Sequence, residues 1–230
     1  MTEIRMHNGR PAIYIDGKVC PETIAFIRTR TRENGELQIH FNSEYFKKLS
    51  ESGVNIFLIS CNTEWLQPDA LEIFDREARM LLEAAPNAYI IPRFGLHAPV
   101  QWCIDNPDAC IRWSDGSYPS SHLFTESYEE DYPLFYSLSS QKWREAAGKA
   151  LVNTWKKLLA LPYAERIIGC FPTAGHTSEW RAGALLTDDA NHRCLDYGEG
   201  FRQDFSEYLR EKYHTDEALQ KAVAYPHSNP

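Results

Sequence analysis

The sequence lacks the marks of several common protein classes. No stretch approaches the ~20 consecutive apolar residues that a membrane helix needs, and the N-terminal MTEIRMHNGRP has no apolar region of the signal-peptide kind. We therefore expect a cytoplasmic protein with no membrane partner. The chain carries a net charge of -8, and because nucleic-acid binding normally needs a basic face, we expect no nucleic-acid partner either.

Motifs of several catalytic chemistries are also missing. The sequence has no GxGxxG after a strand, no GxxxxGKS/T, no HExxH and no GxSxG, which leaves dinucleotide, P-loop, zincin and nucleophile-elbow chemistry without support. The six cysteines form no CxxC pair and no His/Cys cluster at metal-ligand spacing. The sequence thus predicts neither a zinc site nor a disulfide framework, and we expect no metal and no cofactor.

Apolar segments and amphipathic helices alternate along the chain. An Asp16-Gly17 turn between two short β-branched and aromatic runs predicts an N-terminal β-hairpin within residues 1–22, leading into a first core strand near Phe26. Further strands are predicted at 54–60, in AYIIPRF (88–94) and in RIIGCF (166–171), and helices at 44–52, 68–85, about 141–159 and 200–213. This alternation predicts a parallel α/β sheet.

The number of predicted units bears on the fold class. Four βα units fill the chain, whereas a complete (β/α)₈ TIM barrel has eight and takes about 250 residues. Either the chain is an open four-unit α/β domain, or residues 1–230 form an incomplete TIM barrel of about the first four βα units. A half barrel leaves its first and last strands with unpaired edges, so we expect the isolated chain to aggregate or to form a homo-oligomer.

Candidate functional residues follow the predicted strands. In a parallel barrel, functional side chains collect where strands end and the loops toward the next helix begin. The candidate substrate-binding residues at these places are Asn62, Trp65, Arg93, His97, Trp102, His176 and Trp180. Each of these residues could instead have a purely structural role. An amide or imidazole can form hydrogen bonds within its own loop, a guanidinium can form a structural ion pair, and an indole can pack in the core.

The order and spacing of several segments resemble the family 42 β-galactosidases and their relatives. The resemblance spans about Ser43 to the C-terminus. It rests on Trp65, Phe74-Asp75, AYIIPRF, PVQWCIDNPDACIRWSDG (99–116), SLSSQKWREAAGKALVNTWKKLL (137–159), RIIGCF and FRQDFSEYLREKYHTDEALQKAV (201–223). It implies the N-terminal half of the catalytic TIM barrel of a glycoside hydrolase. Such an enzyme performs retaining hydrolysis of a β-galactoside or related glycan, with a carbohydrate substrate as partner and no cofactor.

The resemblance also implies a catalytic acid. In the family, a Glu at the end of the fourth strand, usually preceded by Asn, is the general acid/base. Here Ala174-Gly175 occupies that place and the nearby carboxylate is Glu179, within GHTSEW, so we assign the role to Glu179. Alternatively, Glu179 is a first-turn carboxylate at a helix N-terminus. The nucleophile comes from the seventh strand in this clan and is expected beyond Pro230, so the chain by itself is expected to be inactive.

Two other functions fit the same residues. A non-hydrolytic carbohydrate-binding protein would keep the aromatic residues of the barrel mouth and lack the nucleophile, and glycan binding without turnover would favour it. An unrelated α/β domain with structural or interaction duties would place Glu179, Arg93 and Trp102 on different faces.

Overall fold

The structure is a computed structural model that describes residues 2–20, 23–27, 30–31, 37–38, 43–119, 134–174, 180, 187–188 and 193–224. The chain divides into two compact units. Unit 1 contains residues 1–97 and 148–174, and unit 2 contains residues 98–147 and 175–230. The expectation of one catalytic domain over 1–230 stays a prediction.

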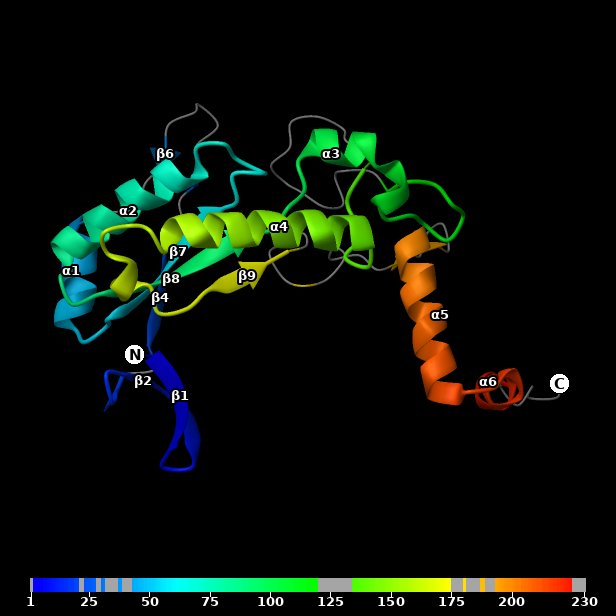
Figure 1. Cartoon of the computed structure of the whole chain (residues 1–230), viewed down its shortest axis with the longest axis horizontal. Helices are drawn as coiled ribbons and strands as arrows, with labels where there is room; N and C mark the ends of the chain where they lie inside the picture. Colours follow the sequence, from blue (N-terminus) through cyan, green and yellow to red (C-terminus); the bar gives the residue numbers. More distant parts are fainter. Residues whose placement is uncertain are drawn as a thin grey trace. The chain divides into compact units, whose positions relative to one another are not determined.

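The centre of unit 1 is a curled four-stranded parallel sheet. Its strands lie in the order β4 (Ile24–Ile27), β7 (Ile56–Asn62), β8 (Tyr89–Gly95) and β9 (Phe171–Thr173), so that spatial order follows chain order (Figure 1). All three neighbouring pairs are parallel. This confirms the predicted parallel α/β arrangement and is consistent with an incomplete TIM-barrel-like fold.

Helices cover one face of this sheet. α2 (Ala70–Ala84) packs on β7 and on α1 (Ser43–Glu51). The ring of Phe46 from α1 meets Phe57 edge-on at 6.0 Å, and Trp155 from α4 (Gln141–Leu158) meets Phe94 at 6.1 Å. Since successive side chains of a strand point to opposite faces, Leu58, Ser60 and Asn62 lie on the other face and are only partly buried.

That other face is partly covered by the N-terminal sheet. Strands β1 (Thr2–His7), β2 (Arg10–Ile15) and β3 (Lys18–Val19) pair antiparallel in this order. Ile15 and Cys20 form a buried cluster with Ile56, and Tyr89 and Ile91 pack against it. Phe26 near the end of β4 remains 48% exposed, and Phe171, the first residue of β9, remains 50% exposed.

The structure confirms the predicted N-terminal hairpin and adds a second one. The Asp16-Gly17 turn exists, but it joins β2 to a two-residue β3, and a second turn at Asn8-Gly9 makes the longer hairpin of β1 and β2. Asn8, Gly9, Asp16 and Gly17 all have positive φ, and Asn-Gly and Asp-Gly are the pairs that such tight turns favour. The Asn8-Gly9 pair carries the same turn signal in the sequence as Asp16-Gly17.

The fourth strand begins later than predicted. RIIGCF contributes only an isolated bridge between Ile167 and Ile90, and β9 proper begins at Phe171. At that point Phe171 pairs with Arg93. Between the two pairings the fourth strand advances four residues, from Ile167 to Phe171, whereas β8 advances three, from Ile90 to Arg93. The extra residue interrupts the ladder as a β-bulge does, which explains why the apolar run and the paired strand do not coincide.

In unit 1 the described residues further include the two-stranded ribbon β5 (Arg30–Thr31) and β6 (Leu37–Gln38), and a 3₁₀ turn, η3 (Ala164–Arg166). Unit 2 includes α3 (Val100–Asp105), the 3₁₀ turn η1 (Pro107–Ala109), α5 (Glu199–Tyr213), α6 (Asp216–Val223) and the ribbon β10 (Thr187–Asp188) with β11 (Arg193–Cys194). Among α3, α5 and α6, the sequence pattern predicted α5 alone.

The core of unit 2 combines stacked rings with one buried carboxylate. Tyr136 and Trp143 stack with ring centroids 4.8 Å apart. The carboxylate of Asp196 accepts hydrogen bonds from the backbone N–H of Gly198 at 2.6 Å, from the N–H of Arg112 at 3.2 Å and from the hydroxyl of Ser137 at 2.5 Å. A buried carboxylate satisfied by three segments fixes them relative to one another.

Candidate functional site

Two predicted site residues meet at the carboxyl edge of the sheet of unit 1. Asn62 ends β7 in register with Gly95, which ends β8. A Cβ built on Gly95 would lie 2.5 Å from Oδ1 of Asn62 and 3.5 Å from Cδ2 of His97. The missing side chain at Gly95 therefore makes room for the amide of Asn62 beside the imidazole of His97.

The amide of Asn62 is held in one orientation. Its Nδ2 donates to Oε1 of Gln67 at 2.8 Å, and the backbone N–H of Gln67 donates to the carbonyl of Thr63 at 3.0 Å. Within the described residues, Oδ1 of Asn62 accepts no hydrogen bond. It is thus a placed acceptor at the strand end. Sequence reasoning missed Gln67, because a glutamine in a loop gives no signal until the partner that it touches is known.

Arg93 lies on the same face of the sheet, two residues before Gly95 on β8. Its guanidinium carbon lies 5.2 Å from the ring centroid of Phe26, a cation–π distance. Burial lowers the pKa of His97, and the positive charge of Arg93 lowers it further. Both causes favour the neutral imidazole, which donates and accepts a hydrogen bond.

Trp65 lies half-buried in the turn after β7. Directly before it, Glu64 forms an ion pair with Lys157 of α4. Thr63, one residue earlier, is buried, and its hydroxyl has no hydrogen-bond partner among the residues that the structure describes. The backbone of Thr63 accepts from the N–H groups of Leu66 and Gln67. The turn that carries the indole is thus closed by the Thr63 carbonyl and anchored to α4 through Glu64.

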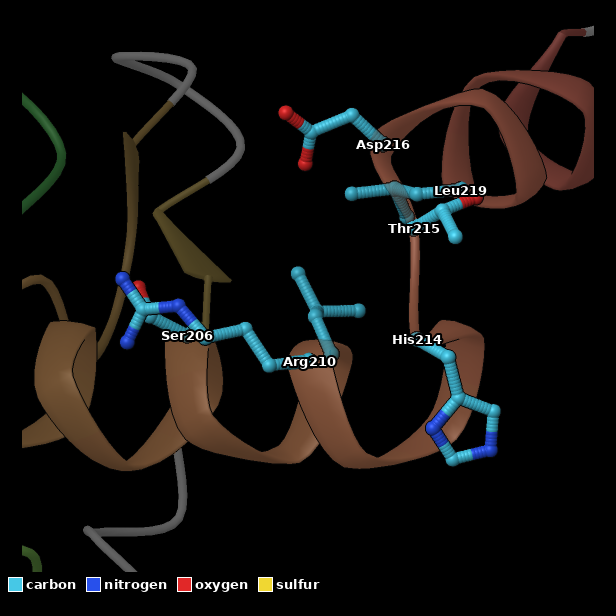
Figure 2. Close-up of a pocket in the computed structure, with 7 residues that line it drawn as sticks. Ser206, Arg210, His214, Thr215, Asp216 and Leu219 are labelled. Atoms are coloured by element: carbon cyan, nitrogen blue, oxygen red, sulfur yellow. The ribbon is translucent and has the colours of Figure 1, made fainter.

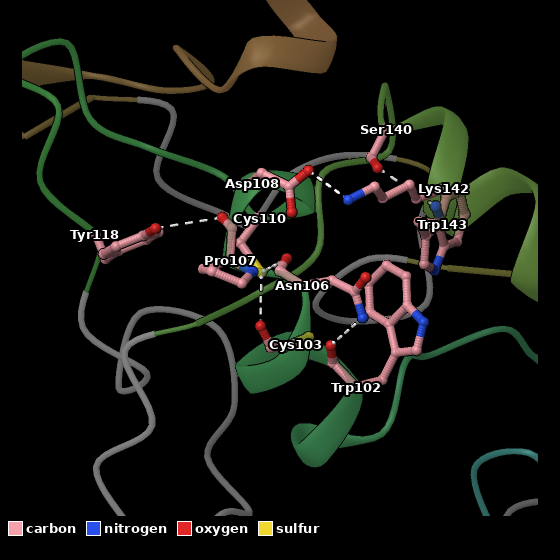
Figure 3. Close-up of polar contacts among 10 residues, drawn as sticks. All are labelled: Trp102, Cys103, Asn106, Pro107, Asp108, Cys110, Tyr118, Ser140, Lys142 and Trp143. Carbon is pink, nitrogen blue, oxygen red and sulfur yellow. Dashed lines mark hydrogen bonds and ion pairs between the residues drawn. The ribbon is translucent and has the colours of Figure 1, made fainter.

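Two other predicted residues, Trp102 and Trp180, belong to unit 2. Trp102 belongs to α3 in unit 2, where its carbonyl accepts from Nδ2 of Asn106 at 2.9 Å (Figure 3). Trp180, also in unit 2, is 56% exposed and meets the ring of Trp143 edge-on at 6.4 Å. His176 and Glu179 lie outside the described residues. Their assignment and the role of the whole set stay predictions.

A buried acid that sequence reasoning missed lies on the helix-covered face. Glu77 of α2 is only 4% exposed, and burial raises its pKa to about 7. Burial, with the charge of Glu77 as a second cause, raises the pKa of the Cys61 thiol to about 12. Helical spacing could have found this acid, because Glu77 falls between Phe74 and Leu81 on the buried side of α2. Cys61 and Asn62 point to opposite faces, so Glu77 and Asn62 lie on opposite sides of the sheet.

In the described ranges, no group of three His, Cys, Asp or Glu side chains could hold a metal ion, and no helix there has the length and hydropathy to cross a membrane. A pocket of about 210 Å³ lies at the junction of α5 and α6. Figure 2 shows the His214 imidazole turned away from the Asp216 carboxylate, and Thr215 caps α6 by accepting from the N–H of Ala218 at 3.1 Å.

No protein-family model and no curated protein matches the chain. Solved structures that resemble it include the β-galactosidase of psychrophilic Marinomonas ef1, with 17% identity and a TM-score of 0.48. The β-galactosidase of Bacillus circulans sp. alkalophilus has 15% identity and a TM-score of 0.47. Each alignment covers 78% of this chain but 24% and 23% of the respective enzyme, so the chain spans about a quarter of their length. The likeness concerns the path of the backbone, and membership of family 42 stays a prediction.

Proposed function

We propose that the chain is part of a retaining glycoside hydrolase that acts on a β-galactoside or a related glycan. One observation carries the proposal. The carboxyl ends of neighbouring parallel strands bring together Asn62, Arg93 and His97 on the face of the sheet that the helices leave open. In barrels of this kind, the substrate lies at this edge.

These groups suit the chemistry of a sugar. A pyranose presents hydroxyls that both donate and accept hydrogen bonds, and its C–H faces pack on aromatic rings. The fixed acceptor of Asn62 and the neutral imidazole of His97 are complementary to such hydroxyls. Trp65, on the anchored turn after β7, supplies an indole from the same strand end.

Catalysis is assigned to Glu179 on the sequence resemblance. A glycosidic oxygen leaves only when it is protonated, so the acid needs a raised pKa, which an aromatic neighbour such as Trp180 favours. A retaining enzyme also needs a second carboxylate at roughly 5 Å as nucleophile. We propose that it comes from the seventh strand, beyond Pro230.

Sugar binding to the full 230-residue chain tests the proposal. Methyl β-D-galactoside is titrated while the backbone amides are followed by NMR, against the wild type, Asn62→Ala and Asn55→Ala. Asn55 is the matched control because it precedes the amino end of the same strand. We expect Asn62→Ala to weaken binding about tenfold, since one lost hydrogen bond costs about 1 kcal/mol or slightly more, and Asn55→Ala to leave it unchanged.

Each result decides a different part of the proposal. Absence of binding, or equal weakening by both variants, would contradict a sugar site at this strand end. Hydrolysis of a nitrophenyl β-galactoside is expected to stay at the level of the blank. Turnover by the wild type that is lost in Glu179→Gln would support the acid and contradict the placement of the nucleophile beyond Pro230.

A further inference from the structure

Unit 2 contains a larger pocket to which no candidate residue belongs. It has a volume of about 590 Å³, within the ~300–1,000 Å³ that is typical of small-molecule sites. Its lining includes Asp108, Arg112, Trp113, Tyr197, Glu199 and Arg202. These residues come from η1, from the loop that follows it and from the start of α5.

The two acids of this pocket already have partners. Asp108 accepts from Nζ of Lys142 at 2.6 Å (Figure 3), and this contact lowers the pKa of the Asp108 carboxyl. Oε1 of Glu199 accepts from Nε2 of Gln203 at 2.9 Å, one turn further along α5. The carboxylate of Asp108 is thus balanced by a cation, and that of Glu199 is tied to its own helix.

Among the described residues, neither guanidinium group forms an ion pair, although the charge of Arg112 contributes to the lowered pKa of the Asp108 carboxyl. Arg112 donates to the carbonyl of Gly116 at 3.2 Å and to the hydroxyl of Tyr118 at 2.6 Å, both neutral oxygens, and its guanidinium carbon lies 4.4 Å from the Tyr118 ring centroid. In the described part of the chain, the guanidinium of Arg202 makes no hydrogen bond and no ion pair. The N-terminus of α5 adds positive potential to the same place. The pocket therefore favours an anion.

An apolar surface accompanies these charges. The ring of Tyr197 is 50% exposed, whereas Trp113 is buried beside the guanidinium of Arg193 and serves as a wall. An exposed aromatic face next to guanidinium donors suits a ligand with a C–H face and an oxyanion. A planar carboxylate matches the planar donor fork of arginine.

We propose that this pocket binds a sugar acid, a pyranose that carries a carboxylate. Arg112 and Arg202 bind the carboxylate, and the ring of Tyr197 packs against the sugar. The pocket belongs to unit 2 and the Asn62 group to unit 1, and the proposal does not depend on the hydrolase function, because it requires binding alone.

Titration calorimetry on the full chain tests this site with D-galacturonate, D-galactose and inorganic sulfate as probes. We expect galacturonate to bind at least ten times more tightly than galactose, and Arg202→Gln to abolish that difference. Arg210→Gln is the matched control, since Arg210 is an exposed arginine two turns further along α5 and does not line this pocket. We expect it to leave both affinities unchanged. Because both substitutions lie on exposed positions of α5, far-UV circular dichroism should be the same for all three proteins.

Several outcomes would overturn the proposal. Equal affinity for galactose and galacturonate would remove the role of the carboxylate. Full retention of galacturonate binding in Arg202→Gln would remove the role of Arg202. Sulfate that binds as tightly as galacturonate would reduce the pocket to a general oxyanion site. Galacturonate binding that is lost in Asn62→Ala and kept in Arg202→Gln would place the sugar acid at the site of the proposed hydrolase and overturn the proposal.

Discussion

Replacing Glu77 by glutamine should change how the stability of the protein depends on pH. Glu77 lies on the buried side of α2, where burial raises its pKa from 4.5 to about 7. An acid with a raised folded-state pKa contributes stability that is fully present below the unfolded pKa and is lost as the pH rises through the folded pKa. Wild-type stability should therefore fall between pH 4.5 and pH 7, while glutamine cannot ionise.

The size of the effect follows from the pKa. One pKa unit corresponds to about 1.4 kcal/mol, and at pH 5 the acid is still protonated in the folded protein. Between pH 5 and pH 8 the ionisation of Glu77 should lower the free energy of unfolding by about 2 kcal/mol, an order-of-magnitude value. The Glu77→Gln variant should gain that amount relative to wild type over the same interval.

Urea denaturation at pH 5 and pH 8 measures this difference. Glu83→Gln, an exposed position on the same helix, removes one charge without removing a buried acid and serves as the control. We expect its difference from wild type to be the same at both pH values. If the Glu77→Gln difference were also equal at pH 5 and pH 8, the carboxyl would not titrate in the folded protein as burial requires.

Three further predictions concern the site, a helix start and the sheet edges. Gly95→Ala should displace Asn62, because the new Cβ would lie 2.5 Å from its Oδ1, and methyl β-D-galactoside titrated by NMR should bind at least tenfold more weakly; unchanged binding would contradict the contact. Ser140→Ala should cost about 1 kcal/mol in urea unfolding, since the Ser140 hydroxyl accepts from the N–H of Trp143 at 3.3 Å, and no loss would show that this cap is unimportant. The isolated chain should elute above its monomer mass of 26.5 kDa in size-exclusion chromatography with light scattering, because the edge strands β4 and β9 keep apolar side chains exposed; a monomer with a sharp, cooperative melt would count against the half barrel.

The long elements of the fold could be predicted because each is defined by its own residues. The continuous apolar run at 54–60 predicts β7, and the spacing of Leu71, Phe74 and Leu81 predicts α2. The short helices α3 and α6 could not be predicted in the same way. Each contains too few residues for a clear periodic pattern, and such short helices form only when tertiary packing stabilises them. The late start of β9 depends on a pairing register with β8 that no single segment encodes.

The candidate site was predictable in position more than in detail. Asn62, Arg93 and His97 could be singled out because polar groups directly behind buried strands fall at the same edge of a parallel sheet. The hydrogen bond from Asn62 to Gln67 and the space left by Gly95 could not, since both depend on how two loops meet in space. The division into two compact units is likewise a property of long-range contacts.

The most direct test of the account is an experimental structure of the chain with a non-hydrolysable thio-β-galactoside. The account predicts hydroxyls of the sugar in hydrogen bonds with Asn62 and His97, and the carboxyl of Glu179 at hydrogen-bond distance from the glycosidic sulfur. A ligand bound away from the carboxyl edge of the sheet, with Glu179 directed into bulk solvent, would contradict it.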